Sequence, residues 1–303
     1  MAVRRHRDPG DPRDPRASTL LVPATTYTRG DRVLLGLPFD ASIPTRGGAK
    51  HGPQAFREAL PSLTTFGHGV ELAGRQVLDL GDLDLPPDSI RIAHERVQSA
   101  SHDIFAAGAT PFFVGGDNGL TGALLRGLAD ARPDLRLGLV VIDSHYDVRE
   151  YDDEDSLSSG TPYRRALETP ICDGARTFIL GTREFANSGY YDGWVRERGI
   201  TTVPVDAFDA TPAAAIAADV CTRLEASSDA IFLSIDIDAA ELPGSSAAPG
   251  TLSSREMIAI VRAIAASPLL IGCDLSELSP PWDVSGMTAK LAARLFLEVL
   301  VQT

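Results

Sequence analysis

Residues 139–147 read LVVIDSHYD, in which an apolar run is followed at once by two aspartates on either side of a histidine. The apolar part is typical of a strand that is buried on both faces of a parallel sheet. Side chains alternate along a strand with a period of two, so Asp143, His145 and Asp147 are expected to point the same way where the strand ends. This stretch therefore predicts a cluster of ionisable groups at one edge of a buried sheet.

A second stretch repeats the pattern. Residues 231–238 read IFLSIDID, which places Asp236 and Asp238 at the end of another apolar run. Carboxylates gathered with an imidazole at one sheet edge repel one another unless a cation lies between them. Oxygen-rich donors with a single nitrogen suit Mn²⁺ better than they suit a metal that prefers thiolates. A lone aspartate at a strand end is more often a helix cap or a turn former, but two such segments together favour a two-metal hydrolase.

Stretches typical of strands and helices alternate along most of the chain. The expected strands are residues 32–37, 76–80, 110–114, 137–142, 177–180, 201–205, 230–235 and 268–273. The expected helices are residues 53–60, 89–107, 119–131, 162–167, 189–199, 212–226, 253–266 and 286–301. Such alternation predicts an α/β fold, in which a parallel sheet carries helices on both faces. Ligand sites in these sheets lie beyond the carboxyl ends of the strands, where both acidic segments fall.

The overall composition restricts the class of protein. The chain has 303 residues, is 44% hydrophobic and carries a formal net charge of −13, which argues against a nucleic-acid partner and is otherwise typical of a soluble protein. No apolar run reaches the roughly 18 residues of a membrane span. Three scattered cysteines without a CxxC motif favour a reducing cytoplasm. Residues 1–18 are expected to form a disordered leader, and residues 19–303 a single catalytic domain.

Further motifs stand in a characteristic order around the two acidic segments. They are GLPFD (36–40), RGGAKHGP (46–53), GGDN (115–118) and DLSELSP (274–280). With DSHYD and SIDID, they resemble in order the elements of the ureohydrolase family, which includes arginase, agmatinase, guanidinobutyrase and formiminoglutamase. The resemblance covers residues 36–300. It implies a three-layer α/β/α sandwich on a mainly parallel eight-stranded sheet, two Mn²⁺ per chain, a small-molecule amidine or guanidine substrate, and assembly as a homo-oligomer, a trimer or hexamer.

The resemblance also implies roles for the acidic residues. Asp143 and Asp236 resemble the carboxylates that bridge the two metals. His145 and Asp238 resemble the ligands that complete one metal site. Asp147 resembles a ligand of the other site and a carrier of protons.

Two more positions follow from the same resemblance. Glu277 resembles the carboxylate that pairs with the nitrogens of the amidine or guanidine, for which a fork of N–H donors is a good partner. Asn118 stands where the family usually has a histidine ligand. An amide oxygen is a poorer ligand for Mn²⁺ than imidazole, so the metal site beside Asn118 is expected to be weak.

Other departures bear on the substrate. Ser159 stands where arginases and many agmatinases carry a proton-shuttling histidine, and the loop 239–243 has Glu241 in an altered motif whose role stays open. The loop SSGTPYR (158–164) and the segment FANSGYY (185–191), with Asn187, are closer to formiminoglutamases.

Two arginines are candidates for binding the substrate. Arg164 or Arg183 could hold a substrate carboxylate with two hydrogen bonds, although each could equally be a solvated or structural arginine.

These observations predict a manganese-dependent hydrolase of linear amidine C–N bonds, acting on N-formimidoyl-L-glutamate to give glutamate and formamide. Ser159, Arg164, Arg183, Asn187 and Glu277 are the candidate substrate-binding residues, and Asp147 and Glu277 the candidate catalytic ones. Two alternatives remain open. One is a guanidine hydrolase that releases urea, similar to agmatinase or guanidinobutyrase. The other is a metal-poor pseudoenzyme with a binding or regulatory role.

Overall fold

The computed structural model describes residues 11–151, 157–242, 244, 246 and 248–303. Within these ranges the main sheet has nine strands in the order β1-β5-β2-β6-β11-β10-β7-β8-β9. All neighbouring strands of this sheet are parallel. Their carboxyl ends therefore lie along one edge, as the alternation of strands and helices predicts.

The strands of the main sheet are short and mostly apolar. They are β1 (Leu21–Pro23), β2 (Arg32–Leu37), β5 (Val77–Asp82), β6 (Thr110–Gly115), β7 (Leu137–Ile142), β8 (Thr177–Thr182), β9 (Thr201–Pro204), β10 (Ala230–Asp236) and β11 (Leu270–Ser276). Every residue of β7, β8 and β10 is buried. This burial on both faces explains why these strands are continuous apolar runs.

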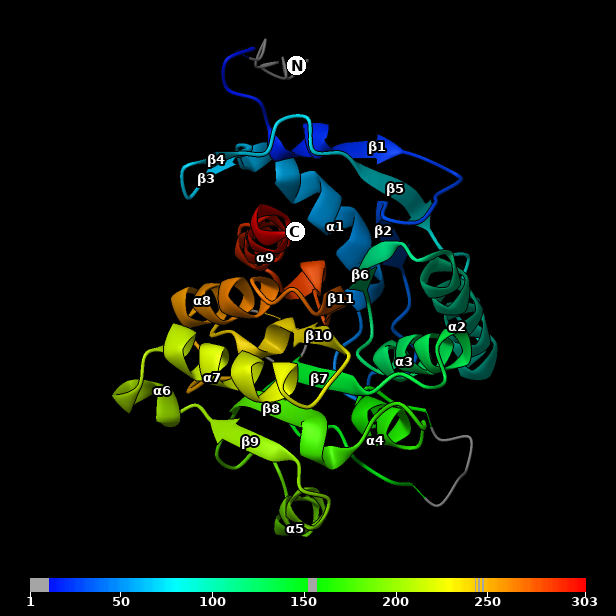
Figure 1. The fold of residues 1–303 in the computed structure, drawn as a ribbon, viewed down its shortest axis with the longest axis vertical. Helices are drawn as coiled ribbons and strands as arrows, with labels where there is room; N and C mark the ends of the chain where they lie inside the picture. Colours follow the sequence, from blue (N-terminus) through cyan, green and yellow to red (C-terminus); the bar gives the residue numbers. More distant parts are fainter. Residues whose placement is uncertain (1–10, 152–156, 243, 245, 247) are drawn as a thin grey trace, which may run out of the picture.

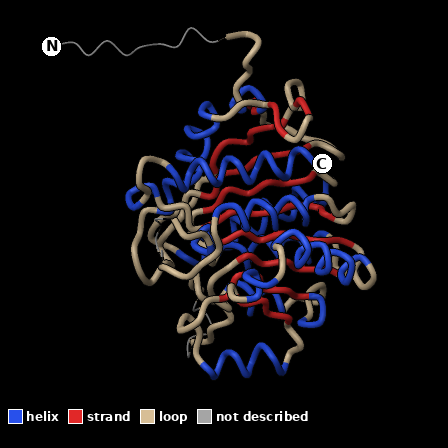
Figure 2. The backbone as a smooth tube through the Cα atoms, turned by 90° about the vertical axis from the view of Figure 1, so that its left-hand side faces the viewer, coloured by secondary structure: helices blue, strands red, loops and turns tan. Residues whose placement is uncertain are grey.

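Helices cover both faces of the sheet. They are α1 (Gly52–Ala59), α2 (Ile90–Ala107), α3 (Leu120–Ala131), α4 (Pro162–Leu167), α5 (Gly189–Glu197), α6 (Ala207–Ala210), α7 (Ala213–Glu225), α8 (Ser254–Ala265) and α9 (Met287–Gln302). Figure 1 shows α1, α9, α8 and α7 on one face and α2, α3 and α4 on the other, and helices lie in front of the strands in the side view of Figure 2. Two separate hydrophobic clusters, one for each face, form the core.

Local sequence signals set the ends of several helices. Ser253 and Glu256 form a capping box at the start of α8, with the serine hydroxyl accepting from the Glu256 N–H. Gly108 ends α2 in the left-handed conformation, with φ of 76°. Glycine adopts this conformation without a steric penalty, so α2 stops there and β6 begins two residues later.

The structure differs from the sequence prediction in a few elements. All eight predicted strands and all eight predicted helices are present, but β1 makes the sheet nine-stranded rather than eight-stranded. The three residues of β1 are too few to show a period. Strand β11 also extends to Ser276, so Asp274 lies inside the strand and Glu277 is the first residue after it.

The amino-terminal segment contacts the rest of the fold before residue 18. Arg16 forms a bridge with Thr64, and Ala17 is buried at the start of a short 3₁₀ helix. The boundary predicted at residue 18 stays a prediction, and residues 1–10 of the expected leader lie outside the described ranges.

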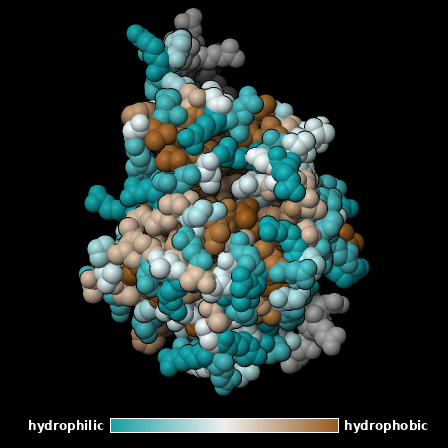
Figure 3. Space-filling view, in the orientation of Figure 1, coloured by the Kyte–Doolittle hydropathy of each residue, from teal (hydrophilic) through white to brown (hydrophobic). Residues whose placement is uncertain are grey.

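None of the helices in the described part of the chain combines the length and apolarity that a bilayer crossing needs. On the face shown in Figure 3, hydrophilic and hydrophobic residues are interspersed, and the most hydrophobic ones form small groups.

Candidate metal centre

Four neighbouring strands end at the same place in the sheet. Strands β6, β11, β10 and β7 are adjacent and parallel, so the segments that follow them meet at one edge. The first aspartate of DSHYD follows β7 directly, and that of SIDID is the last residue of β10. The structure thus brings together segments that are far apart in the sequence, at the edge where open α/β sheets bind ligands.

Two groups of side chains have ligand atoms within 4.8 Å of one another. One consists of Asp143, His145 and Asp238, and the other of Asp143, Asp147 and Asp236. His145 Nδ1 lies 3.3 Å from Asp143 Oδ1 and 3.5 Å from Asp238 Oδ2. Asp143 belongs to both groups. The arrangement therefore has the form of two adjoining cation sites that share one carboxylate.

The aspartates of this cluster are buried and repel one another. Burial and the charge of Asp147 raise the pKa of Asp143 to about 7. Burial likewise raises the pKa of Asp238 to about 7 and that of Asp147 to about 6. Burial followed by the neighbouring aspartates raises the pKa of Asp236 well above its usual value. Such a cluster is costly when ionised, and a cation placed among the oxygens would offset that cost.

The imidazole and one carboxylate oxygen support the same conclusion. Burial alone would lower the pKa of His145, but the surrounding aspartates, Asp143 first, raise it to about 10. Asp238 Oδ1 is buried and has no hydrogen-bond partner among the described residues. Buried carboxylate oxygens are almost always satisfied, so an orphaned one beside His145 fits a metal ligand. The donor set, carboxylates with one imidazole, suits Mn²⁺.

Asn118 lies beside the second group, at the start of the turn before α3. Its amide nitrogen donates to Asp147 Oδ2 at 2.9 Å and lies 3.4 Å from Asp143 Oδ2. Its amide oxygen accepts from the Ser276 hydroxyl at 3.2 Å. In this orientation Asn118 presents a donor to the carboxylates, and its oxygen points away from them.

Glu277 occupies a conformation that its neighbours enforce. Its φ is +61°, which is uncommon for a residue with a side chain. Its N–H donates to Gly116 O at 2.7 Å, and its carboxylate accepts from the Asn118 N–H at 2.9 Å. Asp147 also has a positive φ, of 45°. Both side chains are thereby directed into the same region at the sheet edge.

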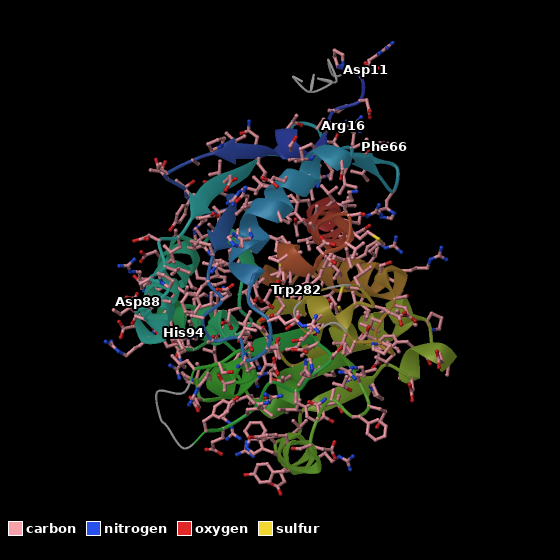
Figure 4. The ribbon with its side chains drawn as sticks, turned by 180° about the vertical axis from the view of Figure 1, so that it is seen from behind. Asp11, Arg16, Phe66, Asp88, His94 and Trp282 are labelled. Atoms are coloured by element: carbon pink, nitrogen blue, oxygen red, sulfur yellow. The ribbon has the colours of Figure 1, made fainter. Side chains whose placement is uncertain are left out.

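The loop that follows β2 is tied to this region. The buried Asp117 accepts hydrogen bonds from the N–H and the hydroxyl of Ser42. Farther along, Trp282 Nε1 donates to Gly47 O at 3.0 Å, and the Arg46 guanidinium lies 4.9 Å from the Trp282 ring centre. Trp282 is labelled near the middle of Figure 4. The loop is therefore fixed at both ends beside the cluster.

A cavity of about 90 Å³ opens onto the cluster. Its walls combine the ligand-type residues with the loops that the sequence places near the substrate. The lining includes His145, Asp147, Asp236, Asp238, Glu277, Ser159, Gly160, Arg149, Pro44 and Thr45. Ser159 and Glu277, both predicted to bind substrate, thus face the same cavity as the aspartates.

Arg164, one of the two arginines predicted to bind substrate, lies outside the lining of this cavity. Arg164 is buried, its Nε donates to Val148 O at 2.9 Å, it pairs with Glu150 at 3.2 Å, and it stacks over Trp194. It does not line the cavity on the cluster, and its contacts are with Val148, Glu150 and Trp194, so its predicted role at the substrate stays a prediction.

Arg183 and Asn187 line a separate hollow of about 370 Å³, next to the cluster. The Asn187 amide accepts from Tyr146 N at 2.8 Å and lies 3.3 Å from Ser144 O, so it braces the DSHYD loop. Neither residue faces the cavity that holds the ligand-type aspartates.

Sequence reasoning missed Arg149, which does line the cavity. It stands two residues after Asp147, so the alternation that aligned the aspartates could have flagged it. Sequence reasoning also missed buried hydroxyl groups near the site. The hydroxyl oxygens of Tyr163 and Ser234 lie 3.2 Å apart, and the Thr121 hydroxyl donates to Asp274 Oδ2 at 2.5 Å. No motif marks these residues as neighbours of the site.

The fold and the cluster define a class of α/β hydrolases with a carboxylate-rich centre that could hold metal ions. The arginase-family profile matches residues 30–301. The chain belongs to the arginase family, and the predicted ureohydrolase resemblance and α/β fold are confirmed.

Similar proteins include several formimidoylglutamases. The formimidoylglutamase of Halobacterium salinarum is 35% identical over 96% of this chain and 94% of its own length. The crystal structure of the Bacillus subtilis formimidoylglutamase superimposes with a TM-score of 0.90, at 25% identity, over 97% of this chain and 93% of that one. A structure of Trypanosoma cruzi formiminoglutamase with Mn²⁺ has a TM-score of 0.83, at 26% identity, over 95% and 98% of the two chains.

Relatives named for guanidine substrates match as well. The guanidinopropionase of Pseudomonas aeruginosa is 31% identical over 88% of this chain and 85% of its own length. Membership of the family is therefore compatible with both an amidine and a guanidine substrate, and the residues of the site must distinguish the two.

Proposed function

We propose that this chain hydrolyses N-formimidoyl-L-glutamate to L-glutamate and formamide, with two Mn²⁺ per chain. The observation that carries the proposal is the pair of ligand groups that share Asp143, because their other four members line one cavity together with Glu277 and Ser159. The similarity to formimidoylglutamases over nearly the whole chain supports the choice of substrate. Ser159, at the place of the family's shuttling histidine, supports an amidine over a guanidine.

The residues fit the metal. Asp143, His145 and Asp238 would hold one ion, and Asp143, Asp147 and Asp236 the other. Bound Mn²⁺ makes coordinated water more acidic and so supplies hydroxide near neutral pH. Asp143, which belongs to both groups, would serve both ions, and the bridging role of Asp236 stays a prediction. The site beside Asn118 is the weaker one, because its amide presents N–H groups to the carboxylates.

The protein's own groups orient the substrate and move the proton. The Glu277 carboxylate accepts hydrogen bonds from the amidine N–H groups, because a carboxylate matches their planar fork. Asp147 carries a proton to the nitrogen that leaves with glutamate. Its carboxylate lines the cavity and is therefore placed to exchange a proton with a bound substrate. Water is consumed, the C–N bond breaks, and formamide and the amine of glutamate are released.

An assay of the two products tests the proposal. Purified protein with added Mn²⁺ should release formamide from N-formimidoyl-L-glutamate. Release of urea from agmatine, guanidinobutyrate or guanidinopropionate, without formamide release, would show instead that the guanidine alternative holds. Absence of both activities, with less than one Mn²⁺ bound per chain in excess metal, would support the pseudoenzyme alternative.

Composition and resemblance support two further proposals. A cytoplasmic location is supported by cysteines that are all buried and free. A homo-oligomer, a trimer or hexamer of single-domain chains, is supported by the resemblance to the family. Light scattering coupled to size exclusion gives the mass of the assembly directly.

A further inference from the structure

The loop that carries His145 is anchored to the fold at two points. At the end of β7, the Asp143 N–H donates to Leu180 O of β8 at 3.0 Å. At the other side of the histidine, the Asp147 carbonyl accepts from the Tyr163 N–H of α4 at 3.2 Å. The N–H of His145 itself donates to Asp143 Oδ1, within the loop. The place of the imidazole therefore depends on what holds the residues directly beside it.

Asn187 holds the main chain on both sides of His145. Its amide oxygen accepts from the Tyr146 N–H at 2.8 Å, and its amide nitrogen donates to Ser144 O at 3.3 Å. An asparagine side chain offers an acceptor and two donors, so it can pair with a main chain as a peptide group of a neighbouring strand does. Ser144 is buried, so its carbonyl needs such a partner. One amide thus fixes the residues before and after the histidine.

A second contact fixes the side chain that follows the histidine. The Tyr146 hydroxyl donates to Asp192 Oδ1 at 3.0 Å, and Asp192 Oδ2 pairs with the Arg196 guanidinium at 3.0 Å. Arg196 lies one helical turn farther along α5, where it helps to hold the Asp192 carboxylate in place. Tyr146 is buried and stands between His145 and Asp147 in the sequence. Its hydrogen bond therefore limits the movement of the main chain that carries both ligand-type residues.

These contacts come from a helix at the periphery of the fold. Of the nine residues of α5, all of which the structure describes, Val195 alone is buried. Figure 1 shows α5 past β9, at the lower edge of the molecule. Core packing therefore explains little of its contact with the loop. The contact consists of directional hydrogen bonds from Asp192 and from Asn187, which lies two residues before the helix.

We propose that Asn187 and Asp192 are positioning residues of the metal centre, which act on a bound metal through His145. The inference rests on the proposed function, since it presumes the Mn²⁺ that Asp143, His145 and Asp238 would hold. It gives Asn187 a role through the loop rather than at the substrate. Residues that orient a metal ligand raise metal affinity, because the ligand then needs no rearrangement before it binds.

Manganese titration of the purified full chain tests the role of Asn187. Asn187→Ala removes both hydrogen bonds and should weaken the tighter of the two Mn²⁺ sites by about tenfold or more. At saturating Mn²⁺, its KM for N-formimidoyl-L-glutamate should stay within about threefold of wild type. An unchanged Mn²⁺ affinity with a raised KM at saturating metal would overturn the assignment and show that Asn187 binds the substrate.

Variants at the second contact separate the hydrogen bond from the charge. Asp192→Asn keeps an acceptor for the Tyr146 hydroxyl and should bind Mn²⁺ within about threefold of wild type, whereas Asp192→Leu and Tyr146→Phe should each weaken binding by about five- to tenfold. The double variant should bind no more weakly than either single one, because both remove the same hydrogen bond.

The same helix offers a matched control. Tyr191→Phe removes another tyrosine hydroxyl of α5, which accepts from the Glu150 N–H at 3.0 Å, beyond the last ligand-type residue of the loop. It should bind Mn²⁺ as tightly as wild type. An equal loss of Mn²⁺ affinity in Tyr191→Phe and Tyr146→Phe would contradict a specific role for Asp192.

The outcomes separate this assignment from the proposed function. A wild type that binds less than one Mn²⁺ per chain in excess metal defeats the proposed function, and this assignment with it. A wild type that binds Mn²⁺ and releases formamide, with Asn187→Ala binding the metal equally tightly, defeats only the assignment. A lower metal-free thermal midpoint in Asn187→Ala without any loss of Mn²⁺ affinity also defeats it, since a purely structural contact predicts that result.

Discussion

The two halves of the carboxylate cluster share Asp143 but differ in what completes them. In one half, His145 and Asp238 lie beside Asp143, and one Asp238 oxygen has no hydrogen-bond partner among the described residues. In the other half, the Asn118 amide already donates a hydrogen bond to Asp147. The first half leaves one Asp238 oxygen without a partner unless a cation is present, whereas the protein itself supplies a hydrogen bond to Asp147 in the second half.

The difference teaches how a single amide changes a metal site. For the Asn118 oxygen to face the cluster, the amide must turn over and lose its hydrogen bond from Ser276. A bare carboxylate requires no such exchange before it binds a cation. We therefore expect the two halves to bind metal with unequal affinity, and each experiment below tests or refines that inequality.

The largest effect should come from the shared residue. Asp143→Asn removes the carboxylate common to both halves, so both sites should fail together. We expect kcat to fall by at least about 1,000-fold, since one misplaced electrostatic group in an active site already costs that order. Elemental analysis should find less than one Mn²⁺ per chain. Asp88→Asn, an exposed position labelled in Figure 4, is the control and should retain full activity and metal.

Exchanging the two distinguishing side chains should change affinity in opposite directions. Manganese titration of wild type should show two unequal steps. Asn118→His supplies a nitrogen ligand and should tighten the weaker step by about tenfold, or 1.4 kcal/mol. His145→Asn should weaken the tighter step by a similar factor. Two equal steps in wild type, or no response to Asn118→His, would contradict the inequality.

Much of this comparison could be predicted from the sequence, and the reason is local. A buried strand that ends in carboxylates is visible as an apolar run followed by DSHYD or SIDID, and strand alternation then aligns the aspartates. The same reasoning identified the eight longer strands. It missed β1, whose three residues include Pro23 and show no period.

The direction of long side chains was not predictable in this way. Arg164 and Arg149 are both near the motif in sequence, but only Arg149 faces the cavity. The difference arises from contacts across the fold, namely the stacking of Arg164 on Trp194 and the space that Gly160 leaves for Arg149. Likewise, the asparagine at residue 118 was visible, but the orientation of its amide depends on Ser276 and Asp147.

The pH dependence should follow from the raised pKa values. Folding raises the pKa of Asp143 to about 7 and of Asp147 to about 6, above the ~3.9 of an unfolded aspartate. The folded metal-free protein therefore binds more protons than the unfolded chain between about pH 4 and 7, and its stability falls as pH rises through that window.

Metal binding should show the opposite trend. Protons compete with Mn²⁺ for the same oxygens, so affinity should fall as pH decreases below about 7. Thermal melts at pH 5.5 and 8 should show a lower midpoint at pH 8 without metal and a larger Mn²⁺-induced rise there. A metal-free midpoint that increases with pH would show that these aspartates do not titrate as the burial argument requires.

The smallest effect should come from the loop beside the Asn118 half. Ser42→Ala removes one of the two hydrogen bonds that Asp117 accepts from Ser42 and leaves the backbone one in place. We expect a loss of about 1 kcal/mol in the free energy of unfolding and a modest rise in KM, because the loop borders the cavity through Pro44 and Thr45. Ser62→Ala is the control, since it removes the hydroxyl hydrogen bond to Ala59 O from an exposed serine on a short 3₁₀ helix that does not line the cavity. It should cost less stability and leave KM unchanged. If both variants change KM alike, the loop acts only through overall stability; if Ser42→Ala also weakens the second Mn²⁺ step, the loop contributes to the weaker half of the centre.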